Sequence, residues 1–156
     1  MITILIVLHV LAAVLFIGPV TVAVSSFQVQ ATRAHEGDSS AAGAATVLHK
    51  ITTTYGVLAA LVPLFGVAIM FLDGGYWREG RYHAAIALAV IAWVLLLLAI
   101  IPRQKKMMGA LGLLDAGDFD PEKDAVANWA KTKSQLSMFG GIFSLLWIIM
   151  LVLMYL

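Results

Sequence analysis

A single ionisable side chain, His9, lies within the apolar stretch that opens the sequence. A polar group in hydrocarbon costs free energy unless it is paired, so an ionisable residue there indicates function. An imidazole can ligate haem or another metal, contact a quinone or carry a proton. The simpler alternative is a neutral imidazole hydrogen-bonded to a neighbouring helix. Helical spacing places His9 on one face with Ala12, Ala13 and Phe16, which predicts that it faces the bundle interior.

The other histidines do not match His9 in depth. At 1.5 Å per residue, His9 lies about 10 Å below the outer membrane boundary. By the same rise, His49 is about 25 Å away along the membrane normal, and His83 is about 10 Å shallower than His9. A haem held between two histidines needs both at one depth. The remaining cofactor options are a haem with one histidine ligand or a quinone contact, both at His9.

Other arrangements that could do chemistry are absent or better explained by structure. The chain has no cysteine, and no serine–histidine–carboxylate set or phosphate loop, so we predict no catalytic residue and no metal site. The acidic run from Asp115 to Asp124 lacks the ligand spacing of a calcium loop and suits helix capping. Met107 and Met108 are adjacent and point to different sides of a helix, which favours packing over copper binding. No carboxylate lies inside an apolar stretch, which disfavours ion-coupled transport.

The composition predicts a membrane protein. Of 156 residues, 62% are hydrophobic and 12% are charged, too apolar for a soluble domain of this size. The net charge of +1 excludes a nucleic-acid partner. The sequence therefore predicts an all-α transmembrane four-helix bundle in a single domain, with spans at about 2–26, 51–72, 84–102 and 136–156.

The cations predict the orientation. Eight lie in the first and third connections and two in the second. By the positive-inside rule, connections one and three are cytoplasmic and both termini are outside. Arg103, Lys105 and Lys106 follow the third span, where they are expected to meet phospholipid head groups.

Local signals predict the connections and one kink. The first connection, 27–48, carries charges and a run of small residues and is expected to be flexible. In the third connection, 103–135, Asp120 and Pro121 suit the N-cap and first position of a helix. Pro63 is expected to kink the second span.

Small residues four positions apart predict close helix contacts. Gly56 and Ala60 form such a pair in the second span, and Gly140 and Ser144 form one in the fourth, with Gly141 in a second pair alongside. Small side chains let helix backbones approach each other.

The opening segment Leu8–Gly18 resembles the first helix of small bacterial four-helix membrane proteins, a family of predicted integral membrane proteins of unknown function related to copper-resistance-D-type domains. His9 and Gly18 match that family's pattern of a histidine, an apolar stretch and a glycine. The resemblance implies a protein that binds a redox group or associates with redox enzymes. The alanine-rich sequence is also similar to accessory subunits of actinobacterial respiratory supercomplexes, in which cytochrome bc is joined to an aa-type oxidase.

Three functions are therefore expected, in decreasing order. The first is a non-enzymatic accessory subunit of a larger membrane complex, the respiratory cytochrome bc–cytochrome oxidase supercomplex, in the bacterial inner membrane and without a cofactor of its own. The second is a haem- or quinone-associated redox membrane protein that uses His9. The third is a small transporter.

Overall fold

The computed structural model describes residues 1–156 and confirms the predicted all-α four-helix bundle. The first rod comprises α1 (Ile2–Ala12), the π-helical segment η1 (Ala13–Ile17) and α2 (Gly18–His35). The second comprises α3 (Ser39–Leu58) and α4 (Leu61–Leu72), and the third comprises α5 (Gly80–Leu95), the π-helical η3 (Leu96–Ile100) and α6 (Ile101–Ala110). The fourth is α7 (Trp129–Tyr155), and a 3₁₀ turn, η2 (Tyr76–Arg78), links α4 to α5.

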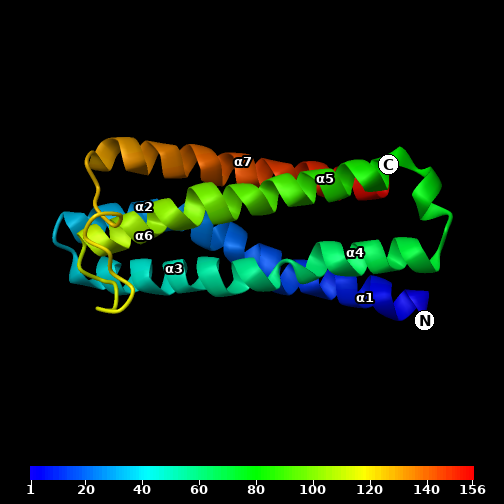
Figure 1. The fold of residues 1–156 in the computed structure, drawn as a ribbon, viewed down its shortest axis with the longest axis horizontal. Coiled ribbons are helices and arrows are strands. Elements are labelled where there is room, and N and C mark those ends of the chain that lie inside the picture. Colours follow the sequence, from blue (N-terminus) through cyan, green and yellow to red (C-terminus); the bar gives the residue numbers. More distant parts are fainter.

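Both chain termini lie at one end of the bundle, together with the connection between α4 and α5 (Figure 1). The connections from α2 to α3 and from α6 to α7 lie at the opposite end. The cation distribution predicts that this end faces the cytoplasm, and it is named the cytoplasmic end after that prediction. This arrangement follows from four antiparallel rods joined in sequence.

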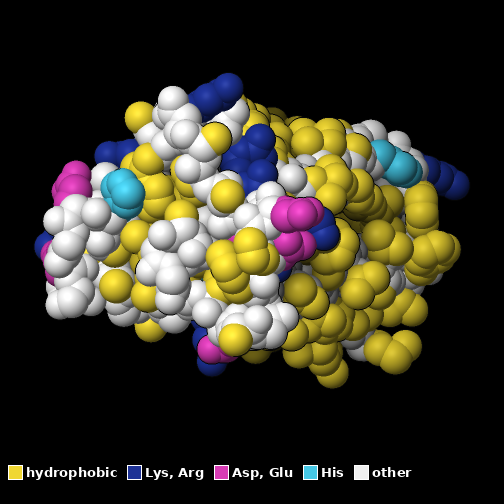
Figure 2. All heavy atoms as spheres, turned by 60° about the vertical axis from the view of Figure 1, so that its left-hand side comes forward, with side chains coloured by type: hydrophobic (Ala, Val, Ile, Leu, Met, Phe, Trp, Pro, Cys, Tyr) yellow, Lys and Arg dark blue, Asp and Glu magenta, His cyan; other side chains and the backbone are white.

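The surface is apolar along the rods. All four helical rods are long and apolar enough to cross a membrane. Large side chains such as Phe71 and Leu98 are each 72% exposed, which only a lipid environment or a partner protein would tolerate. Figure 2 shows charged side chains over the end that carries the long connection and an apolar field beyond them. The chain is therefore a multi-pass membrane protein.

Each proline within a rod follows an irregular stretch of backbone. Pro19 follows η1, Pro102 follows η3, and Pro63 follows a turn at residues 59–60 that separates α3 from α4. A proline has no N–H for the carbonyl four residues earlier and its ring collides with that carbonyl. The π segments and the turn interrupt the regular α-helical hydrogen-bond pattern just before each proline. The predicted break at Pro63 is present, whereas Pro102 lies in the first turn of α6 instead of ending the helix.

The helices run further than the predicted spans at the cytoplasmic end. The expectation of a flexible connection over 27–48 is wrong, because α2 continues to His35 and α3 begins at Ser39. Asp38 caps α3 by accepting hydrogen bonds from the backbone N–H groups of Ser40 and Ala41 at 3.0 and 3.2 Å. The small-residue run is rich in alanine, the strongest helix former, so the cap is sufficient to start a helix there.

The helix expected to begin at Asp120 is also absent. α7 begins nine residues later at Trp129, where the side chain of Asn128 accepts from the N–H of Lys131 at 2.9 Å. Asp120 instead closes a local turn by accepting from the N–H of Glu122 at 3.1 Å. The Asp124 side chain is 5% exposed, and its carboxylate accepts a hydrogen bond from the Asp120 N–H at 2.8 Å. The acidic side chains that suggested a helix cap therefore stabilise the loop.

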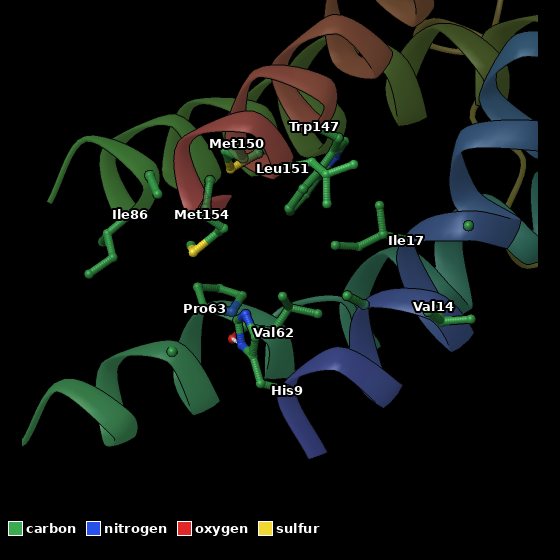
Figure 3. A pocket seen from close by; sticks show the side chains of 15 residues that line it. His9, Val14, Ile17, Val62, Pro63, Ile86, Trp147, Met150, Leu151 and Met154 are labelled. Carbon is green, nitrogen blue, oxygen red and sulfur yellow. Dashed lines mark hydrogen bonds between the residues drawn. The ribbon is translucent and has the colours of Figure 1, made fainter. Parts of the chain in front are cut away.

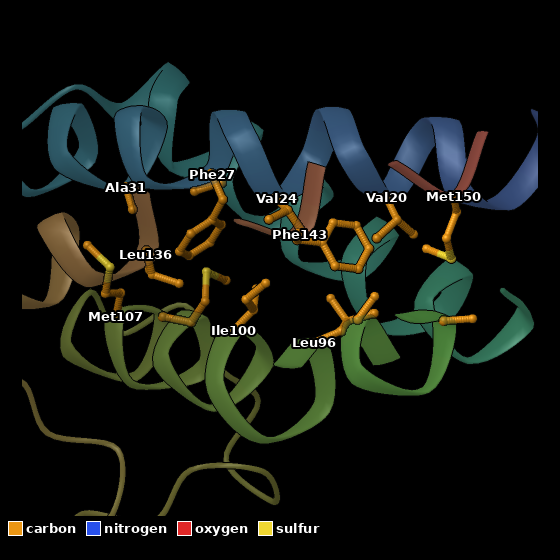
Figure 4. Close-up of a cluster of buried hydrophobic side chains, with 14 of the residues drawn as sticks. Val20, Val24, Phe27, Ala31, Leu96, Ile100, Met107, Leu136, Phe143 and Met150 are labelled. Carbon is orange, nitrogen blue, oxygen red and sulfur yellow. The ribbon is translucent and has the colours of Figure 1, made fainter. Parts of the chain in front are cut away.

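The core lies toward the cytoplasmic half, where α2, α5–α6 and α7 face one another (Figure 4). Phe27 and Phe143 are its largest fully buried side chains. The other buried residues labelled there are aliphatic or methionine: Val20, Val24, Ala31, Leu96, Ile100, Met107, Leu136 and Met150. Tight packing in this half holds the four rods together.

Two of the small residues lie at close helix contacts. A Cβ atom on Gly56 would lie 2.8 Å from Cδ2 of Leu96, and one on Gly140 would lie 3.3 Å from the carbonyl oxygen of Val24. Gly141 has open space around it, Ala60 lies in the turn between α3 and α4, and the Ser144 hydroxyl donates to the Gly140 carbonyl within its own helix at 3.0 Å.

We expect Gly140→Leu to destabilise the bundle by about 1–3 kcal/mol, because the new side chain must displace the α2 backbone at Val24. Thermal unfolding in detergent would show a lower Tm for this variant. Gly141→Leu is the matched control, since a Cβ atom one residue later meets nothing within 4 Å. Equal Tm losses in both variants would contradict the assigned α2–α7 contact.

We expect the cap at Asp38 to fail in acid. Its hydrogen bond to Ser40, aided by the Ala41 N–H and the nearby Arg33 guanidinium, lowers the pKa of the Asp38 carboxyl. A lowered pKa means that the stabilisation is present above the ordinary value near 4 and is lost as pH falls through the lower, folded-state value. Thermal unfolding of the wild type and Asp38→Asn from about pH 6 to 2 should show a smaller acid-induced decrease in Tm for the variant. Parallel pH profiles would refute this.

Candidate functional site

A cavity of about 460 Å³ separates two helix pairs at the end of the bundle that carries the termini. α1 packs chiefly against α4, and α5 packs against α7. The lining is mostly apolar and comes from both pairs (Figure 3); it includes His9, Val14, Ile17, Val62, Pro63, Ile86, Trp147, Met150, Leu151 and Met154. Val14 is 66% exposed and Leu151 61% exposed, so the cavity opens on the lipid-facing surface. Its volume falls in the range of small-molecule sites, about 300–1,000 Å³.

His9 contributes the one ionisable side chain in this lining. Its Nδ1 atom lies 2.9 Å from the carbonyl oxygen of Val62. A carbonyl oxygen only accepts, so Nδ1 carries the proton and donates it. In Figure 3 the other ring nitrogen is directed toward the cavity. His9 thus faces the bundle with Nδ1 fixed by a hydrogen bond to α4, while Nε2 has no hydrogen-bond partner in the protein.

Irregular backbone surrounds His9 on both helices of its pair. η1 begins four residues after His9 and contributes Ala13 and Ile17 to the lining. On the facing helix, the break before Pro63 brings the Val62 carbonyl to the imidazole. A Cβ on Gly66 would lie 3.3 Å from Cε1 of His9, so the glycine gives the ring its room. Irregular backbone at membrane depth occurs where it is buried in protein or lines a cavity, and π segments are frequent at functional sites.

The fixed tautomer decides what His9 can bind. A neutral imidazole that donates from Nδ1 has a lone pair on Nε2, which accepts a hydrogen bond or ligates a metal. Metal-ligating histidines almost always donate their other N–H to a carboxylate, a backbone carbonyl or water. The Val62 carbonyl fills that role for His9. Nowhere does the structure gather three histidine or acidic side chains suited to a bare metal ion, so a metal at His9 would need other ligands.

A cation lies beyond the outer side of the cavity. Arg81 is one helical turn outward from Ala85, which lines the cavity from α5. The guanidinium pairs with Glu79 and lies 4.9 Å over the ring of Tyr82, while its buried Nε atom has no partner. The charge of Arg81 is thus paired within the outer connection, and Arg81 does not line the cavity.

A second polar cluster, not found from the sequence, lies toward the cytoplasmic end. Nδ1 of His49 donates to Oε1 of Gln104 at 3.1 Å, and Nε2 of Gln104 donates to the hydroxyl of Thr52 at 3.3 Å. The Thr52 hydroxyl donates in turn to the Leu48 carbonyl at 2.9 Å. The chain of donors ends on backbone, and Gln104 and Thr52 are fully buried. This cluster joins α3 to α6 and is a structural contact.

The residues expected at lipid head groups are partly engaged with protein. Arg103 donates to Oε1 of Gln135 at 3.2 Å and lies 4.7 Å over the Phe139 ring. The Lys105 ammonium lies 3.7 Å from the Asp124 carboxylate, and Lys106 is exposed.

No protein-family model matches the chain, and the searches of curated proteins and solved structures found no match. The resemblance of the first helix to small bacterial four-helix proteins therefore stays an expectation. The candidate function must come from the cavity itself.

Proposed function

We propose that this protein binds haem, with Nε2 of His9 as an axial ligand to the iron. The observation that carries the proposal is the hydrogen bond from His9 Nδ1 to the Val62 carbonyl, which leaves Nε2 unprotonated and directed into the apolar cavity. Haem brings its own four equatorial ligands, so one protein nitrogen in an otherwise apolar site is sufficient to begin a binding site.

The donor pattern favours haem over an oxidised quinone. Quinone carbonyls accept hydrogen bonds, whereas Nε2 of His9 is itself an acceptor in this tautomer. The indole N–H of Trp147 is buried without a partner and is not exposed to the cavity.

Haem binding would be measured by titrating the purified protein with hemin in mild detergent. We expect one haem per chain with a shifted Soret band, and at least a tenfold weaker affinity for His9→Ala, equivalent to about 1.4 kcal/mol. His83→Ala is the matched control, because His83 is exposed and interacts with the carbonyl of Glu79 in its own helix. No saturable Soret shift in the wild type, or an unchanged one in His9→Ala, would refute the proposal.

We also propose, as the second candidate, that the chain is an accessory subunit of the respiratory cytochrome bc–cytochrome oxidase supercomplex in the bacterial inner membrane. The observation that favours a partner is the exposure of the first rod. In its most apolar window 6% of the residues are buried, against 22–28% in the other three rods. This surface is available to a neighbouring subunit, and haem binding and complex membership are compatible.

For the subunit proposal, we expect the protein to comigrate with respiratory subunits on native gels after gentle detergent extraction from its own membranes. Replacing Ile4 and Val7, two exposed side chains of the first rod that lie outside the cavity lining, by Trp should reduce comigration, because bulky rings would obstruct a close helix contact. Migration of the wild type at its own mass would refute membership.

A further inference from the structure

We infer that Met154 supplies the second axial ligand to the iron, on the opposite wall of the cavity from His9. The inference rests on the proposed haem site. Met154 lies near the outer end of α7, and Figure 3 shows its side chain reaching into the space between α7 and the helix pair that carries His9. Met154 and His9 thus approach the cavity from different helix pairs. Two ligands that bind the two faces of a planar group have to come from opposite sides in this way.

The face of α7 explains why this methionine is available. Trp147, Met150, Leu151 and Met154 recur at intervals of three and four residues and form one stripe that lines the cavity. Met150 is 5% exposed and belongs to the buried core, where it packs with residues such as Val20 (Figure 4). Met154 lies outside that cluster and is 38% exposed. Its thioether is therefore the sulfur that is free to move onto a bound group.

The chemistry of the cavity leaves few other ligands. His49 belongs to the closed cluster with Gln104, and His83 interacts with its own helix at the outer end. The cavity lining offers no carboxylate, tyrosine or cysteine. A thioether is a soft ligand on a flexible, unbranched side chain, and methionine with histidine is an established axial pair for haem.

Such a pair would set the redox behaviour of the site. Methionine with histidine raises the reduction potential of haem iron, and burial in an apolar environment also tunes it. The ligand class is thus an iron porphyrin held with both axial positions filled, which suits electron transfer better than binding of a gas or substrate to the iron.

The test compares spectra of the haem-loaded wild type, Met154→Leu, Met150→Leu and Met138→Leu. We expect the oxidised wild type to be low-spin with the sulfur-to-iron charge-transfer band in the red. Met154→Leu should lose that band, become high-spin and keep haem through His9. Met150→Leu, which changes the other methionine of the lining, should keep the band, and Met138→Leu, on the same helix but outside the cavity, is the control. Met154→His should restore a low-spin spectrum without the band and lower the midpoint potential relative to the wild type.

The possible outcomes separate the two proposals. If Met154→Leu has the wild-type spectrum, or if Met150→Leu loses the band instead, Met154 is not the ligand, while the His9 site stands as long as His9→Ala weakens haem binding at least tenfold. If the wild type binds no haem, both proposals fail. Since leucine and methionine are similar in volume and Met154 is partly exposed, Met154→Leu is expected to fold, and helical circular dichroism verifies this.

Discussion

The structure depends on the pairing of backbone polar groups where no water is available. A membrane helix satisfies its own N–H and C=O groups, and every proline interrupts that pattern. This chain has three prolines within its rods, and each follows a local change of backbone: η1 before Pro19, the turn before Pro63 and η3 before Pro102. Two of these three irregularities, those near Pro19 and Pro63, flank His9. The cavity and its polar group are thus located where the regular helix pattern is interrupted.

The same irregularities divide the bundle into two halves with different packing. In the cytoplasmic half, Phe27, Leu136 and Ile100 fill the space between the rods. In the outer half, α1 and α4 form one pair, α5 and α7 form another, and the cavity lies between them. The packed half thus fixes the helices, and the open half leaves room for a ligand. In helical bundles, cofactor sites are built from side chains on facing helices.

The sequence predicted the class of fold because hydropathy over about 20 residues is a strong signal in lipid. It did not predict where the helices end, because the charges and small residues over 27–48 are equally compatible with a helix once Asp38 supplies a cap. His9 could be identified from its type and position. The cavity could not, because its lining joins η1, the break before Pro63 and the stripe through Trp147, and contacts between distant segments leave no mark on one sequence. One sequence feature did point to the space around the His9 ring, namely Gly66, which lies three residues after Pro63 and leaves room for the imidazole.

The two half-buried histidines show why the surroundings of a residue decide its role. His49 and His9 lie within apolar helices and each donates from Nδ1 to an oxygen. For His49 that oxygen is on Gln104, whose own amide continues the chain of hydrogen bonds to Thr52 and then to backbone, so this imidazole forms part of a closed contact between α3 and α6. For His9 the acceptor is a single fixed carbonyl, and the rest of the ring faces a space lined by apolar side chains. The Nε2 atom of His9 accepts no hydrogen bond from the apolar side chains around it, so it is available to a ligand. The availability of this nitrogen distinguishes a binding site from a structural contact such as that of His49.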